Sequence, residues 1–130
     1  MLHVLYIEDQ ADIQTILKLS LGASKRFRVD VAGTGREGLA GAAALKPDLI
    51  LLDYSLPDMD GPDILTALRA DEATARIPVI FITAMTQQVD ADACIARGAL
   101  DVILKPFSPR EVAGQILGIL ARHGHNIGVA

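Results

Sequence analysis

The 130-residue sequence contains only one cysteine and no long apolar run. Because Cys94 has no second cysteine to pair with, an internal disulfide is excluded, and we expect a reducing compartment, the cytoplasm. The apolar runs are all shorter than the roughly 18–20 residues that span a bilayer, which excludes a transmembrane helix. The first residues also lack the positively charged region of a signal peptide, so we expect none.

The sequence also lacks an excess of basic residues. Its 12 lysine and arginine residues are outnumbered by 16 aspartate and glutamate residues, which gives a formal net charge of −4. Binding to nucleic acid without sequence preference needs a basic patch or stripe, and the sequence contains none. We therefore expect neither direct nucleic-acid binding nor a membrane partner.

What the sequence does contain is apolar residues, at 51% of the chain, in patterns that alternate between strand and helix. Five such pairs predict βα units around a parallel five-stranded sheet, and hence an α/β fold. The predicted strands span residues 3–7, 28–32, 48–52, 79–82 and 101–104, and the predicted helices span 11–21, 35–46, 62–70, 87–97 and 109–122. We expect one domain over residues 1–122 and a flexible tail over 123–130.

Short motifs predict where several of these helices begin and end. Thr34-Gly35-Arg36-Glu37 and Ser108-Pro109-Arg110-Glu111 each have the pattern of a capping box at a helix start. Gly22 and Gly98 are predicted helix stops, because glycine adopts the left-handed conformation at low cost. Asp58 and Asp60 are expected to shape the turn after the third strand and to cap the third helix.

Polar residues with related chemistry follow four of the predicted strands. Glu8 and Asp9 follow the first strand, Asp53 the third, Thr83 the fourth and Lys105 the fifth. Parallel strands bring their carboxyl ends to one edge of the sheet, where open α/β folds bind ligands. The sequence therefore predicts three carboxylates, a hydroxyl and an ammonium group at one site.

This combination of groups suits phosphoryl transfer. Three adjacent carboxylates repel one another unless a cation joins them, and Mg²⁺ is the hard cation that fits a few carboxylates and waters. Lys105 can pair with Asp53 or with an incoming anion, and Thr83 can donate a hydrogen bond to that anion. A carboxylate can also act as a nucleophile that forms an acyl phosphate.

Over residues 1–121 the sequence resembles the receiver domains of two-component response regulators, in particular chemotaxis-regulator-like single-domain receivers. The resemblance rests on Glu8-Asp9, Asp53, Leu56-Pro57-Asp58-Met59-Asp60-Gly61, Ile77-Pro78-Val79-Ile80, Thr83-Ala84, Gly98-Ala99 and Lys105-Pro106-Phe107. It implies a flavodoxin-like (βα)5 three-layer sandwich with strand order 2-1-3-4-5. It also implies a cis bond between Lys105 and Pro106.

The resemblance assigns a role to each site residue. Asp53 is the implied phosphoacceptor, which receives phosphate from a sensor histidine kinase or a histidine phosphotransfer protein. Asp9, Asp53 and the backbone carbonyl of Ser55 are the implied Mg²⁺ ligands, and Glu8 acts through a metal-bound water. Thr83 and Lys105 would contact the phosphoryl oxygens.

The sequence departs from the family at one position and carries two residues expected to set the lifetime of the phosphate. Val102 stands where members usually have tyrosine or phenylalanine, so output is expected from backbone movement after Thr83 or from the fourth helix. Ser55 and Met85 flank the path of an attacking water. Because Met85 offers bulk and no polar group to orient that water, we expect slow self-dephosphorylation.

The leading interpretation is a phosphorylation-operated switch that alters partner binding through its fourth helix, fifth strand and fifth helix. One alternative is an interaction module that works without phosphate. A less favoured one is a phosphohydrolase with an aspartyl-phosphate intermediate. Such enzymes need a second aspartate two residues after the first, where this sequence has Ser55. We therefore expect no turnover of a separate substrate.

Overall fold

The computed structural model describes residues 1–84 and 91–124 of the chain. Its strands are β1 (Leu2–Ile7), β2 (Phe27–Ala32), β3 (Leu49–Leu52), β4 (Val79–Thr83) and β5 (Asp101–Leu104). Its helices are α1 (Ala11–Ala23), α2 (Gly35–Leu45), α3 (Gly61–Ala70), α4 (Ala91–Ala96) and α5 (Val112–Arg122). No helix in the described ranges combines the length and apolarity needed to cross a membrane.

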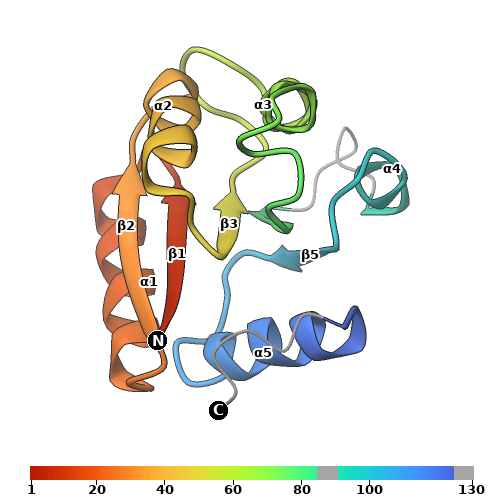
Figure 1. The fold of residues 1–130 in the computed structure, drawn as a ribbon. Helices are drawn as coiled ribbons and strands as arrows, with labels where there is room; N and C mark the ends of the chain where they lie inside the picture. The colour runs from red at the N-terminus through yellow and green to blue at the C-terminus, as the bar shows by residue number, and fades with distance from the viewer. Residues whose placement is uncertain (85–90, 125–130) are drawn as a thin grey trace.

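The five strands form one parallel sheet in the order β2-β1-β3-β4-β5, which confirms the predicted α/β fold and strand order. Because successive side chains of a strand point to opposite faces, each strand contributes to two cores. Val4 and Leu51 pack with α1 and α5 on one face, whereas Leu5 and Ile50 pack with α2, α3 and α4 on the other. The sheet therefore forms the middle of three layers (Figure 1).

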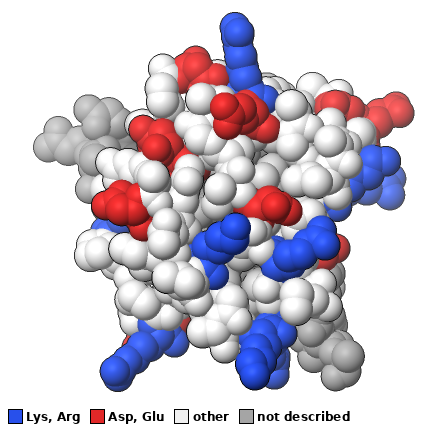
Figure 2. Space-filling model, turned by 90° about the vertical axis from the view of Figure 1, so that its left-hand side faces the viewer, with Lys and Arg blue, Asp and Glu red and all other residues white. Residues whose placement is uncertain are grey.

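The arrangement of charge follows the direction of the strands. In Figure 1, β1 and β2 both point upward, so the upper end of the molecule is the carboxyl edge of the sheet. Figure 2 keeps the same vertical axis and shows acidic side chains mainly in the upper half, with basic side chains mainly in the lower half. The edge predicted to hold the site is thus the more acidic end of this face.

Several local predictions are confirmed. The Thr34 side chain caps α2 by accepting a hydrogen bond from the Glu37 backbone N–H at 3.1 Å. Gly98 follows α4 with a φ of +116°, the conformation expected at the predicted stop. The Lys105–Pro106 peptide bond is cis. Of the predicted fourth helix, residues 87–90 lie outside the described part of the chain, as do residues 125–130 of the predicted tail.

Two other local predictions are wrong. Helix α1 continues past Gly22 to Ala23, and Lys25 rather than glycine takes the positive φ, at 60°. Helix α5 starts at Val112 without a side-chain cap, because the residues after Ser108 form a turn whose N–H groups bond to the Ser108 carbonyl. The predicted capping box at Ser108 is therefore not formed as a helix start.

His3 lies inside β1, and its side chain is only 13% exposed. Its imidazole is 2.6 Å from an Asp30 oxygen and 3.2 Å from Arg28. The neighbouring strand β2, which the sequence placed correctly, supplies both partners.

Candidate functional site

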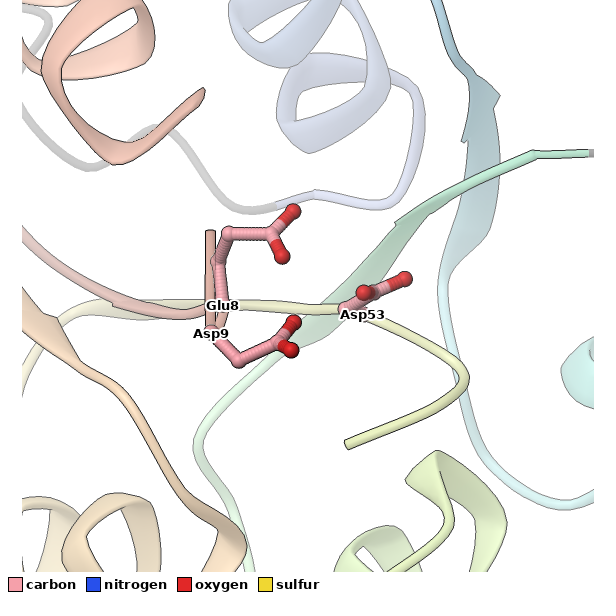
Figure 3. A group of neighbouring side chains, drawn as sticks. All are labelled: Glu8, Asp9 and Asp53. Carbon is pink, nitrogen blue, oxygen red and sulfur yellow. The ribbon is translucent and has the colours of Figure 1, made fainter. Parts of the chain in front are cut away.

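The register of the central strands brings the predicted acidic residues together. Ile7 is paired with Leu52 across β1 and β3, and the Asp53 N–H continues the ladder by donating to the Ile7 carbonyl at 3.1 Å. Glu8 and Asp53 are therefore the next residues on adjacent strands. One carboxylate oxygen from each of Glu8, Asp9 and Asp53 lies within 4.8 Å of the others (Figure 3).

These three carboxylates differ in exposure. Glu8 is fully buried and Asp53 is 8% exposed, whereas Asp9 is an exposed residue at the rim. Desolvation is the largest cause that raises the pKa of Asp9 above its ordinary value, followed by its hydrogen bond with Glu8. A cation bound here would favour the charged form of Asp9 and oppose this shift.

The buried Glu8 carboxylate is held by three donors. Its Oε1 atom accepts from the Lys105 ammonium and, at 3.2 Å, from the Tyr6 hydroxyl, while Oε2 accepts from the Gln10 N–H at 3.3 Å. Burial first, and then the charge of Glu8, raise the pKa of Tyr6 far above its ordinary value. The Tyr6 hydroxyl therefore stays protonated at neutral pH and donates to Glu8. Together with Lys105 and the Gln10 N–H, it gives the buried carboxylate the partners that it needs away from water.

Asp53 is held more loosely than Glu8. One of its oxygens accepts from the Tyr54 N–H at 2.8 Å, and the other lies 3.5 Å from the Lys105 ammonium. Asp53 faces an open hollow of about 710 Å³ at the carboxyl edge of the sheet. The hollow is lined by Asp9, Gln10, Ile13, Asp53, Tyr54, Ser55, Asp60, Thr83, Ala84 and Lys105.

Strand pairing also explains why Thr83 and Lys105 lie at this hollow. Thr83 ends β4 opposite Leu104 of β5, and the Lys105 N–H donates to the Thr83 carbonyl at 2.9 Å. Thr83 is 4% exposed. All the residues assigned to the site from the sequence are thus at or beside one hollow, with Glu8 buried beneath it. Met85, the residue expected to affect phosphate lifetime, lies outside the described part of the chain.

One prediction about the loop after Asp53 is wrong. Asp58 does not cap α3; its carboxylate accepts hydrogen bonds from the N–H groups of Gly35 and Arg36, at the start of α2. Asp60 does occupy the N-cap position of α3, but it makes no side-chain cap bond there, and its carbonyl accepts from the Ile64 N–H instead. The sequence could not predict this role of Asp58, because its hydrogen-bond partners are 22 and 23 residues away in the sequence.

Tyr6 is a site residue that the sequence analysis did not identify. It is fully buried in the core beneath the sheet edge, as expected for packing, but its hydroxyl contacts Glu8. The available signal was the spacing, because Tyr6 and Glu8 are two residues apart and point to the same face of β1. Val102 is half-buried and packs against the core on the α4 side of the sheet.

The donor set fits a hard divalent cation. Among the residues that the structure describes, Glu8, Asp9 and Asp53 are the one group of three acidic or metal-binding side chains close enough to share an ion. Oxygen donors at a partly open site suit Mg²⁺, which keeps several waters. Cysteine and histidine, the ligands that favour zinc, are absent from this group.

Comparison with known proteins agrees with this geometry. The family model of the response regulator receiver domain matches residues 4–117. The chain is 36% identical over 121 residues to the DNA-binding response regulator MtrA of Mycolicibacterium paratuberculosis, covering 93% of this chain and 52% of MtrA. It is 37% identical over 119 residues to the alkaline phosphatase synthesis transcriptional regulatory protein PhoP of Bacillus subtilis, covering 92% of this chain and 48% of PhoP.

The fold is likewise similar to solved structures. The chemotaxis response regulator CheY4 of Vibrio cholerae superposes with a TM-score of 0.83 at 28% identity, covering 92% of this chain and 99% of that one. By contrast, the chain spans about half the length of the curated relatives it matches.

Proposed function

This chain belongs to the response regulator receiver domain family, and we propose that it is a phosphorylation-operated switch with Asp53 as its phosphoacceptor. The observation that carries the proposal is the convergence of Glu8, Asp9 and Asp53 within 4.8 Å, with the Lys105 ammonium beside them. Of these acids, Asp53 is the one that both lines the open hollow and has an oxygen 3.5 Å from the Lys105 ammonium.

The proposed reaction is transfer of a phosphoryl group from a phosphohistidine. An Asp53 carboxylate oxygen attacks phosphorus, the new O–P bond forms, and the N–P bond to the donor imidazole breaks. The donor is a sensor histidine kinase or a histidine phosphotransfer protein. Because the hollow is open, a histidine on another protein can reach Asp53 without movement of the sheet.

We assign Mg²⁺ binding to Asp9, Asp53 and the Ser55 carbonyl, with Glu8 acting through a metal-bound water. Bound Mg²⁺ would supply charge neutralisation for the phosphoryl oxygens. Glu8 itself is fully buried and held by three donors, which suits an indirect role. Ser55 and Asp9 both line the hollow around Asp53.

The proposed switch begins with Lys105 and Thr83. A phosphoryl group adds about −1.5 to −2 charges at Asp53, which attracts the Lys105 ammonium across its present 3.5 Å separation and away from Glu8. Thr83 would donate its hydroxyl to the same group. Lys105 directly follows β5 and Thr83 ends β4, so these movements pass to the segment after Thr83 and to the face formed by α4, β5 and α5.

A hollow of about 530 Å³ between β5 and α5 gives this face a concave surface to which a partner protein can bind. Val102 lines it together with Ile103, Leu104 and Gln115. Because valine has no ring to swing inward, output would come from backbone movement after Thr83 or from α4. We assign this chain protein partners rather than nucleic acid, because its 16 acidic residues outnumber its 12 basic ones.

Receiver domains are typically signalling switches, and we propose that this chain turns over no separate substrate. A cytoplasmic location is part of the proposal and rests on membership of the family.

The test is incubation with Mg²⁺ and acetyl phosphate, a small phosphodonor, followed by intact-mass measurement. We expect the mass of one added phosphoryl group, absent in Asp53→Asn and absent when Mg²⁺ is chelated. No gain in mass would favour the interaction module that works without phosphate. Steady release of p-nitrophenol from p-nitrophenyl phosphate would instead favour the phosphohydrolase.

A further inference from the structure

The loop between β3 and α3 is attached to a helix that lies elsewhere in the chain. The two oxygens of the Asp58 carboxylate accept separate hydrogen bonds, from the Gly35 N–H at 2.7 Å and from the Arg36 N–H at 3.0 Å. These bonds hold the pKa of Asp58 below its ordinary value, with the Gly35 bond as the larger cause. Asp58 is therefore ionised at neutral pH and binds the N-terminus of α2, where a negative charge is favourable.

The same loop is closed on itself. The Leu56 N–H donates to the Met59 carbonyl at 3.2 Å, and the Gly61 N–H donates to the Tyr54 carbonyl. Ser55 and Asp60 form an isolated antiparallel bridge across the loop. Because these bonds join its two arms, the position of the loop tip and the position of Ser55 are linked.

A second contact presses the loop against α2. A Cβ atom added at Gly35 would lie 2.9 Å from the Met59 Sδ atom and 3.1 Å from Ile64, so glycine is what allows this approach. The loop tip is thus fixed by the two Asp58 bonds and by Met59. The Ser55 carbonyl and Asp53 lie at the other end of the same closed loop.

We infer that Asp58 is a positioning residue for the cation site, and that it fixes the Ser55 carbonyl by attaching the loop to α2. The inference rests on the proposed function, because it assigns to that site the residue that orders one of its oxygen ligands. Asp58 does not contact the cation. Its effect passes through the loop, as residues outside the ligand set commonly orient the ligands of a metal.

The chain offers a matched control at the same helix terminus. Thr34 caps α2 through its own side chain, whose hydrogen-bond partner, the Glu37 N–H, belongs to α2 and not to the loop. Thr34→Ala therefore weakens the start of α2 while Asp58 still holds the loop. Asp58→Ala removes both bonds between the loop and α2, whereas Asp58→Asn removes one of them, because its amide keeps a single acceptor oxygen.

The experiment is binding of Mn²⁺ followed by electron paramagnetic resonance, with Mg²⁺ as competitor, on wild type, Asp58→Asn, Asp58→Ala and Thr34→Ala. Circular dichroism and thermal unfolding identify the variants that fold at the assay temperature. We expect the Kd for both ions to rise about tenfold in Asp58→Ala, and to rise less in Asp58→Asn, which keeps one acceptor oxygen. We expect little change in Thr34→Ala, even where its unfolding temperature falls as far.

Two results would overturn the inference. One is an unchanged Kd in the folded Asp58 variants while wild type binds the ion and Asp53→Asn binds it more weakly. The other is an equal rise in Kd in Thr34→Ala and the Asp58 variants, which would assign the effect to α2 stability. If wild type itself binds neither ion, or Asp53→Asn binds as wild type does, the cation site of the proposed function fails as well.

Discussion

Lys105 donates through its ammonium group to the fully buried carboxylate of Glu8, while the same ammonium lies 3.5 Å from Asp53. One cation thus serves two carboxylates of unequal exposure. The stability of the protein should therefore change when the charge of Lys105 or of Asp53 is removed.

Lys105→Met should destabilise the protein in the absence of divalent cations. The variant leaves the buried charge of Glu8 without its main partner, and removing one member of a buried pair costs about 3 kcal/mol. Urea unfolding in a chelating buffer measures this loss, and added Mg²⁺ should recover part of it. Lys18→Met, at an exposed position of α1, is the control and should change stability little. Equal effects of the two variants would contradict the pairing.

Asp53→Asn should stabilise the protein without Mg²⁺. Removing one of three negative charges within 4.8 Å relieves repulsion by about 1–2 kcal/mol. Saturating Mg²⁺ should raise the unfolding temperature of wild type more than that of Asp53→Asn, since a ligand stabilises the state it binds. A variant less stable than wild type in chelating buffer would contradict this account of the acidic cluster.

Tyr6→Phe should cost about 1–2 kcal/mol, because it deletes one donor to a buried carboxylate and little volume. The slope of the urea transition should stay unchanged, as expected for an intact core. No loss of stability would show that the Tyr6 hydroxyl does not support Glu8.

The raised pKa of Asp9 predicts a dependence on pH with a definite sign. A carboxyl group whose pKa is higher in the folded state binds its proton more tightly there, so its contribution is present at low pH. That contribution is lost as pH rises from the ordinary value of 3.8 through the raised value. In chelating buffer, wild type should therefore lose stability relative to Asp9→Asn over this window. A relative gain as pH rises would contradict the shift.

Gly61→Ala should disturb the loop that follows the phosphoacceptor. The added Cβ would lie 2.6 Å from the Phe81 ring and 2.7 Å from the Asp53 carbonyl oxygen, and that backbone atom cannot move aside cheaply. We expect a loss of about 2 kcal/mol and slower phosphorylation by acetyl phosphate. Gly41→Ala is the control, because its Cβ would meet Leu5 at an ordinary 3.5 Å.

The sequence was sufficient for the sheet and for most of the site, for a physical reason. Each of four apolar strands runs directly into a polar residue, and parallel pairing aligns those strand ends, as Ile7 and Leu52 do. Local periodicity and the rules of strand pairing are therefore sufficient to predict that Glu8, Asp53 and Lys105 lie close together.

Contacts between segments that are distant in the sequence could not be predicted from local periodicity and strand pairing. The Asp58 carboxylate reaches α2 across 22 and 23 residues, and the His3 imidazole reaches Asp30 across 27. No local pattern encodes either distance. The predicted start of α5 was wrong for a related reason. Ser108 begins a sequence typical of a capping box, but the residues after it form a turn, and α5 starts only at Val112.

The most direct test of the central claim is chemical identification of the phosphorylated residue. After incubation with acetyl phosphate and Mg²⁺, borohydride reduction converts an aspartyl phosphate to homoserine, which peptide mass spectrometry locates. We predict homoserine at position 53 alone, and none in a sample without Mg²⁺. Homoserine at Asp9 or at another acidic residue, or wild type that takes up no phosphoryl group, would contradict the assignment of Asp53.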